Sequence, residues 1–192
     1  MSVRGRLRRL LVVGLVVAGC WQLGAAGWIH VKAVVAQVLI RDAWAATLRD
    51  GGEHAPWPWA DTVPVARLRV PRLGVDLVAL QGFSGQALAF GPGAVTLSNG
   101  VRVLSGHRDT HFQFIAGLET GDVLTLEQRD RISVAYRVVG MRVVDYRDTG
   151  VVSGATRGVL ALVTCWSLNA FAPGGRLRLV VTAREESRTR ST

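Results

Sequence analysis

The hydrophobic pattern begins with one continuous apolar run and then changes to a helical period. Residues Leu10–Ile29 carry no charge, and a helix of about 20 residues spans roughly 30 Å, the thickness of a hydrocarbon core. Residues 31–49 repeat apolar positions at helical spacing, with one face formed by Val31, Val34, Val35, Val38 and Leu39. The pattern predicts a transmembrane helix over 10–29 and a juxtamembrane helix and linker over 30–59.

From Val63 onward, short β-branched stretches recur between turn signals, as they do in small all-β domains. The stretches are residues 66–70, 75–80, 101–104, 123–127, 132–144, 159–164 and 177–182. Asn99-Gly100 separates "AVTL" from "VRVL", which predicts a hairpin, and a short helix is expected in 82–88 or 110–118. The fold class is therefore predicted to be mainly β: a closed or nearly closed barrel of about eight strands with one or two short helices, over residues 60–185. The polar end, 186–192, is predicted to be a disordered tail.

Charge gives the N-terminal run an orientation. Arg4, Arg6, Arg8 and Arg9 lie in the basic segment 1–9 that precedes it. The positive-inside rule then predicts a single-pass protein of the inner (cytoplasmic) membrane, with a cytoplasmic N-terminus and a periplasmic or extracytoplasmic domain. A cleaved signal peptide is an alternative. Another is a lipoprotein signal, because "VAGC" ends at Cys20, but the apolar run continues past this cysteine and favours an uncleaved anchor.

Composition excludes several classes of function. The net charge is +9, but beyond residue 56 the basic residues are scattered and no aromatics are interleaved with them, so no nucleic-acid partner is expected. Lys32 is the single lysine of the chain, which rules out a Ser–Lys dyad or a Schiff-base lysine in the predicted barrel. No acidic cluster has the character of a calcium site. We expect neither a metal nor a cofactor.

Cys165 closes the apolar stretch "ALVTC" and is the only cysteine outside the predicted span. A lone cysteine is usually a small hydrophobe, but two basic side chains occur at strand ends elsewhere in the predicted barrel. His107 follows a strand and a glycine, and Arg178 lies early in the last strand. An imidazolium and a guanidinium near a thiol favour its nucleophilic thiolate, so these three residues are candidate catalytic groups.

Two alternatives remain open at this point. His111 comes four residues after His107 and competes with it for the role of the base. Arg176 lies two residues before Arg178 and therefore on the same face of the strand.

Three segments, in this order along the chain, resemble the sortase family. They are "GHRDT" at residues 106–110, "LVTC" at 162–165 and "RLVVTA" at 178–183. Ala161 stands where the family pattern usually has threonine, at the outer edge of the cysteine motif. The resemblance covers roughly residues 60–185, favours Arg178 over Arg176, and is closest to the Gram-negative class of sortases.

The resemblance implies a transpeptidation. Cys165 would attack the Thr–Gly carbonyl of an LPxTG-like sorting signal at the C-terminus of an exported protein and form a thioacyl enzyme. His107 would protonate the leaving amine and then deprotonate an incoming amine nucleophile, and Arg178 would hold the substrate and its developing oxyanion. The backbone N–H after Cys165 is a further candidate donor. Candidate substrate-binding residues are Thr164, Trp166, Arg176 and Asp109.

Other interpretations are weaker. An L,D-transpeptidase-like enzyme also uses cysteine and histidine, but its signature places serine and glycine before the cysteine, where this chain has Val163-Thr164. A papain-like protease would have its cysteine early in the chain. A non-catalytic, membrane-anchored β-domain differs from the enzymes in one expectation, because a buried structural Cys165 would resist alkylation.

Overall fold

The computed structural model describes residues 3–148, 157–168 and 175–186, and the side chains of residues 3–10, 26, 29 and 30 lie outside that description. The chain forms two compact units, residues 1–38 and 39–192. The predicted tail, apart from Glu186, lies outside the described residues.

One long helix, α1, runs from Val3 to Asp50. The two helical segments expected from the sequence are therefore continuous, since no glycine or proline interrupts residues 31–49. The helix ends at Gly51, which adopts a left-handed φ of +75° and donates its N–H to the Thr47 carbonyl at 2.8 Å. A glycine at this position is the usual helix terminator, because it reaches positive φ without steric cost.

The first unit consists of helix α1 up to Val38. Among its described side chains, the large apolar ones are exposed, including Leu11, Val12, Val16, Trp21 and Leu23. Over the described part of the chain, no helix has both the length and the apolar character required to cross a membrane. The transmembrane helix over 10–29 stays a prediction.

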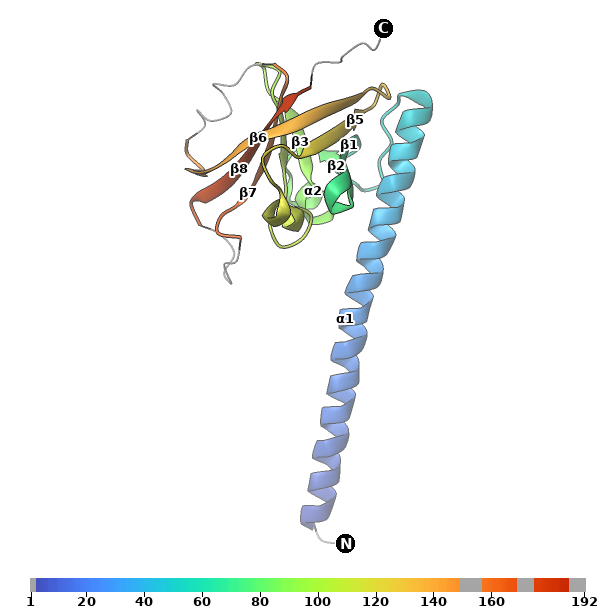
Figure 1. The fold of residues 1–192 in the computed structure, drawn as a ribbon. Coiled ribbons are helices and arrows are strands. Elements are labelled where there is room, and N and C mark those ends of the chain that lie inside the picture. Colours follow the sequence, from blue (N-terminus) through green and yellow to red (C-terminus); the bar gives the residue numbers. More distant parts are fainter. Residues whose placement is uncertain (1–2, 149–156, 169–174, 187–192) are drawn as a thin grey trace. The chain divides into compact units, whose positions relative to one another are not determined.

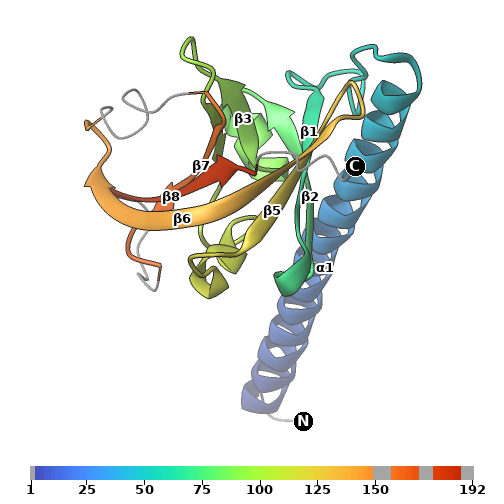
Figure 2. The ribbon, with the colours of Figure 1, turned by 45° about the horizontal axis from the view of Figure 1, so that its top comes forward.

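The second unit contains a closed barrel whose strands follow the order β1-β2-β3-β4-β7-β8-β6-β5 (Figures 1 and 2). The eight-stranded barrel predicted from the alternating pattern is confirmed. Its strands are β1 (Pro64–Val70), β2 (Val75–Gln81), β3 (Gly93–Thr96), β4 (Arg102–Ser105), β5 (Val123–Gln128), β6 (Ser133–Asp145), β7 (Val159–Cys165) and β8 (Leu177–Glu185).

Short helices and one hairpin complete the barrel. The 3₁₀ helix η2 (Gln113–Gly117) lies within one of the two segments proposed for a short helix, and helix α2 (Gly85–Phe90) overlaps the other and extends two residues beyond it. A further 3₁₀ helix, η1, covers Pro71–Leu73. Strands β3 and β4 are antiparallel neighbours around the Asn99-Gly100 turn, which confirms the predicted hairpin.

Strand β7 separates two apolar clusters because its side chains alternate between the barrel interior and its outer face. Leu160 and Leu162 point inward and belong to the main core, whereas Val159 and Ala161 belong to a second cluster on the outer face. Val180 of β8 lies in that outer cluster with them. Val163 packs against the same cluster. Cys165 is two residues further along the strand and therefore lies on the same outer face, at the end of β7.

The C-terminal end of α1 belongs to the same unit as the barrel. Ile40 and Trp44 are 1% and 2% exposed and pack with Val78, Leu80 and Ala87. Trp57, in the segment after the helix, also packs against this cluster and meets Phe90 edge-on at a centroid distance of 4.9 Å. These contacts anchor the segment between α1 and β1 to one side of the barrel.

Candidate active site

Parallel pairing of β4 with β7 brings two distant segments to the same end of the barrel. Ser105 pairs with Val163, and the Gly106 N–H donates to the Val163 carbonyl at 3.2 Å. This register brings His107, one residue further along, to the level of the end of β7. His107 and Cys165, 58 residues apart in the chain, thus lie at the ends of two adjacent strands.

Antiparallel pairing of β7 with β8 adds the third group. Cys165 lies directly opposite Arg178 in the register, and both side chains are half-buried. Residues directly opposite in an antiparallel pair project to the same face of the sheet. The strand order β4-β7-β8 therefore places Cys165 between His107 and Arg178.

The two candidate arginines differ in their partners. Arg176 is ion-paired with Asp145 at 3.0 Å. Arg178 donates from Nη1 to the carbonyls of Gly175 and Leu177 at 2.8 and 2.9 Å. Among the described residues no carboxylate forms an ion pair with Arg178, so its positive charge remains available to a ligand. Both the register and the charge distinguish Arg178 from Arg176.

The two candidate histidines also have different surroundings. His107 is exposed in the turn after β4. His111 is half-buried, and burial lowers its pKa below the ordinary value, against a hydrogen bond with the backbone of Ala89 in α2 that acts in the opposite direction. His111 is thus directed toward α2, whereas His107 stands beside the strand that carries the thiol.

Arg108 is a site residue that the sequence reasoning missed. Its side chain is only 4% exposed, and Nη1 donates to the Ser167 carbonyl at 2.7 Å. Asp109, itself exposed, accepts from Arg108 Nε at 3.2 Å. Arg108 therefore links the histidine turn to the segment that follows Cys165. Its position next to His107 within "GHRD" was the available signal, but a charged residue in a turn is ordinarily solvent-exposed.

Thr164 and Gly106 hold the same two segments together on the other side of the backbone. The Thr164 side chain is buried, and its hydroxyl donates to the Gly106 carbonyl at 2.8 Å. At Gly106 a Cβ atom would lie 2.9 Å from the ring of Phe112, so a residue with a side chain would displace that ring. The close approach explains glycine directly before His107.

The backbone N–H of Trp166, a candidate donor to the substrate because it follows Cys165, already has a hydrogen-bond partner. It donates to the Leu177 carbonyl at 3.0 Å, which continues the β7–β8 ladder. The Trp166 side chain is half-buried against the main core. Within the described ranges, Arg178, opposite Cys165, keeps Nε and Nη2 N–H groups that donate to no backbone carbonyl.

The arrangement supplies the parts of a nucleophilic site. It contains a partly exposed thiol, an exposed imidazole and a guanidinium without a carboxylate partner, which together suit acyl transfer. The described residues include no group of three or more His, Cys, Asp or Glu side chains that could hold a metal ion.

Comparison with known proteins gives consistent matches. The sortase domain model matches residues 68–186. Sortase D of Bacillus subtilis (strain 168) is 33% identical over 105 residues, which cover 52% of this chain and 52% of that protein. The chain thus spans about half the length of the curated relative it matches.

Solved structures with a similar fold include sortase A from Corynebacterium diphtheriae, with a TM-score of 0.58, 19% identity, and coverage of 70% of this chain and 66% of that one. Sortase C-1 from Actinomyces oris gives a TM-score of 0.55 at 24% identity and covers 65% and 75% of the two chains. At these identities the likeness concerns the fold.

Proposed function

This chain belongs to the sortase family, and from that premise we propose that it is a cysteine transpeptidase that acts on a sorting signal of exported proteins. The observation that carries the proposal is the register of three neighbouring strands, which puts Cys165 opposite Arg178 and beside the turn of His107. The products would be a cleaved signal and a protein joined to an amine acceptor.

The first half-reaction forms a thioacyl enzyme. The Cys165 thiolate attacks the carbonyl carbon of the scissile peptide bond and forms an S–C bond, and the electron pair moves to the carbonyl oxygen. The imidazolium of His107 gives its proton to the departing amine as the C–N bond breaks. The second half-reaction reverses the roles: an amine attacks the thioester, neutral His107 takes its proton, and the thiolate leaves.

Arg178 stabilises the negative charge that develops on the carbonyl oxygen. Its Nη1 is engaged with two backbone carbonyls, which hold the guanidinium in place and leave other N–H groups for the oxyanion. A preorganised donor of this kind strengthens its interaction only when the charge forms. The oxyanion donor must lie opposite Cys165 in the β7–β8 register, and that residue is Arg178. We do not expect this role of Arg176.

An LPxTG-like segment is the proposed substrate. Support comes from membership of the sortase family and from the resemblance of the segments at 106–110, 162–165 and 178–183 to the motifs of that family. Trp166, Arg176 and Asp109 lie near the thiol in the chain or the register and are proposed to contact the substrate. Thr164 is proposed to serve the same site through its bond to Gly106.

We further propose that the protein is anchored in the inner membrane, with the barrel on the outer side. Support comes from the uncharged run at 10–29, the four arginines before it and the exposed apolar side chains of the described part of this segment.

Alkylation of Cys165 tests the enzymatic proposal against a non-catalytic β-domain. A Cys20→Ala background leaves Cys165 as the only thiol, so modification by iodoacetamide followed by mass spectrometry reports on one residue. We expect rapid modification, and a much slower one after His107→Ala, with His111→Ala as the matched control. With an LPxTG-containing peptide, a thioacyl adduct should form on this protein and not on Cys165→Ala. A thiol that resists alkylation in the folded protein would overturn the proposal.

A further inference from the structure

A cavity lies inside the barrel mouth at the end remote from Cys165. Its volume is about 610 Å³, which is within the range of about 300–1,000 Å³ typical of small-molecule sites. Four apolar residues from four different strands contribute to its wall, namely Ala66, Ala94, Leu104 and Leu126. The interior of an eight-stranded barrel is either filled by side chains or holds one small ligand.

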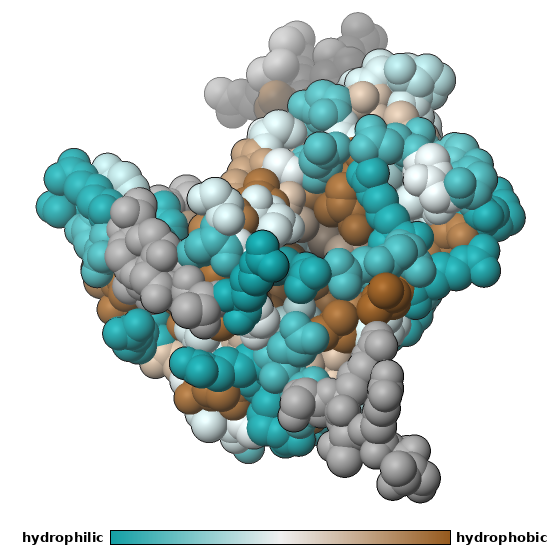
Figure 3. Space-filling model, turned by 90° about the horizontal axis from the view of Figure 1, so that it is seen from above, coloured by the Kyte–Doolittle hydropathy of each residue, from teal (hydrophilic) through white to brown (hydrophobic). Residues whose placement is uncertain are grey.

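The cavity is separate from the proposed active site. Arg102, which lines it, is the first residue of β4, and Ser105 is the last. These two residues are roughly 10 Å apart at the usual rise of a strand, and His107 lies beyond Ser105. The β5–β6 turn, which includes the lining residue Asp130, lies at the upper end of the barrel in Figure 1. From that side, hydrophobic residues are visible between hydrophilic ones (Figure 3).

Arg102 gives this cavity a fixed positive charge. Its guanidinium reaches across the barrel, where Nη1 donates to the Tyr136 hydroxyl at 2.6 Å and Nη2 donates to Gln128 Oε1 at 2.8 Å. Both acceptors are neutral. The Gln128 amide does not ionise, and burial raises the pKa of the Tyr136 hydroxyl further above its ordinary value. Within the described ranges no carboxylate forms an ion pair with Arg102, which is half-buried.

Two other charged groups contribute to the lining, and they differ from Arg102 in exposure or in pairing: Asp130 is exposed and Arg129 has an ion-pair partner. Arg129 is ion-paired with Glu53 at 2.7 Å, and a carboxylate oxygen of Asp130 accepts the N–H of Ile132 at 3.0 Å. Arg102 is thus a half-buried cation of the lining, and among the described residues no carboxylate is within ion-pair distance of its guanidinium. A half-buried guanidinium in an apolar cavity favours an anionic ligand, and its planar fork of N–H groups fits a carboxylate in particular.

We propose that this barrel mouth binds a small organic acid, with its carboxylate on Arg102 and its apolar body against the Ala66, Ala94, Leu104 and Leu126 wall. The proposal is independent of the transpeptidase activity and concerns a second site. The carboxylate can belong to a free acid or to the C-terminus of a short peptide, because both present the same group to the guanidinium.

The test is a binding titration of the full-length protein in detergent, followed by NMR chemical shifts. Hexanoate is the first probe and hexanamide its neutral counterpart, and an N-acetylated alanine dipeptide with a free or an amidated C-terminus forms the second pair. We expect each acid to bind at least about tenfold more tightly than its amide, since the charged hydrogen bond distinguishes them. Which acid binds more tightly separates the two sources of the carboxylate.

Three variants locate the effect. In Arg102→Gln the preference of acid over amide should disappear, because a neutral side chain that can still hydrogen-bond replaces the guanidinium. Tyr136→Phe removes one support of Arg102 but keeps its charge, so the preference should remain. Arg142→Gln removes an exposed arginine elsewhere on the barrel and should change nothing.

Equal binding of acid and amide, or acid binding that survives Arg102→Gln, would overturn the proposal. So would a failure of every probe to bind at millimolar concentration while the protein is folded. The dispersion of the amide resonances in the same NMR samples shows whether each variant keeps its fold, so loss of folding is not mistaken for loss of the site.

Discussion

Arg178 and Arg176 are two residues apart, but only Arg178 is opposite Cys165 in the β7–β8 register. If Arg178 acts as one oxyanion donor, Arg178→Ala should cost roughly 2.7–4 kcal/mol of transition-state stabilisation, or about 10²–10³ in rate. The measurement is the rate of thioacyl formation with a sorting peptide. Arg176→Ala is the matched comparison and should cost less than Arg178→Ala, because Arg176 is a proposed substrate contact held in a largely exposed ion pair with Asp145 and is not the oxyanion donor. The reverse order of effects would transfer the role to Arg176.

Arg108 is predicted to position the site without touching substrate. Arg108→Met removes a charged hydrogen bond to the Ser167 carbonyl, and such bonds contribute about 1.5–3 kcal/mol to stability. We expect a lower midpoint in urea unfolding and, under conditions where the variant is fully folded, slower alkylation of Cys165. Arg108→Lys should restore part of the alkylation rate. A variant that loses stability but keeps the wild-type alkylation rate would show that Arg108 is only structural.

At the level of single residues, Cys165, His107 and Arg178 are predicted from strand ends and motif order. The register puts Cys165 opposite Arg178 and brings the end of β7 level with the turn of His107, and the catalytic roles of the three residues stay a prediction. The burial of Arg108 and the engagement of the Trp166 N–H with Leu177 depend on how two turns meet in space. The local sequence of either turn does not predict these contacts.

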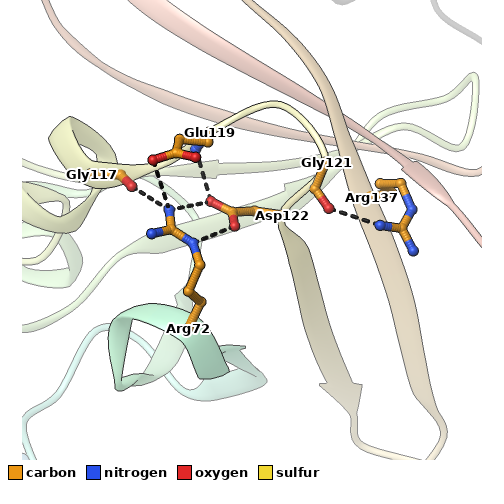
Figure 4. Close-up of polar contacts among 6 residues, drawn as sticks. All are labelled: Arg72, Gly117, Glu119, Gly121, Asp122 and Arg137. Carbon is orange, nitrogen blue, oxygen red and sulfur yellow. Dashed lines mark hydrogen bonds and ion pairs between the residues drawn. The ribbon is translucent and has the colours of Figure 1, made fainter.

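Among the elements, η1 and the turn before β5 are joined by a paired arginine and aspartate (Figure 4). Arg72 Nε donates to Asp122 Oδ1 at 2.5 Å and Arg72 Nη2 donates to Oδ2 at 2.7 Å. The second oxygen also accepts the Glu119 N–H at 2.8 Å. The hydrogen bonds from Arg72 are the main reason that the pKa of Asp122 lies below its ordinary value, and the bond from the Glu119 N–H acts in the same direction. The pair therefore fixes the segment that follows η2 onto the start of the barrel.

This pKa direction predicts a pH-dependent stability. Because the folded protein holds the Asp122 pKa below its unfolded value, the stabilisation is complete above the unfolded pKa of about 4 and is lost as the pH falls through the folded pKa. The melting temperature of Asp122→Asn should thus lie below that of the wild type at pH 7, and the gap should narrow toward pH 2–3. Asp61→Asn is the control at an exposed position outside this contact. A gap that does not change with pH would contradict the prediction.

Elements with strong alternation were predicted with bounds close to those observed, including β5, β6 and β7. The continuity of α1 was not predicted, because the pattern changes near residue 30 from apolar on all sides to apolar on one side while the backbone remains helical. Strand β8 extends to Glu185, beyond the predicted end at residue 182. Its last residues pair with β6, a tertiary contact that overrides their polar character.

In the whole molecule, the barrel unit begins before the first strand, at Leu39 within α1. Ile40→Ala should destabilise this unit by about 2–5 kcal/mol, the usual cost of truncating a buried side chain, because Ile40 is only 1% exposed. Leu39→Ala, at a neighbouring position that is 37% exposed, should cost much less. Urea unfolding followed by barrel tryptophan fluorescence measures both. Equal effects would mean that the helix end contributes little to the barrel.

The parallel contact between β4 and β7 also bears on how the protein acquires its thiol chemistry. Ser105 and Val163 pair across more than fifty intervening residues, so the chain must close a long loop before this contact forms, and folds dominated by distant contacts fold slowly. Until closure, the sulfur of Cys165 has no neighbouring base. A freshly refolded chain therefore passes through an interval in which it is inactive, and an activity lag is the expected signature of that interval.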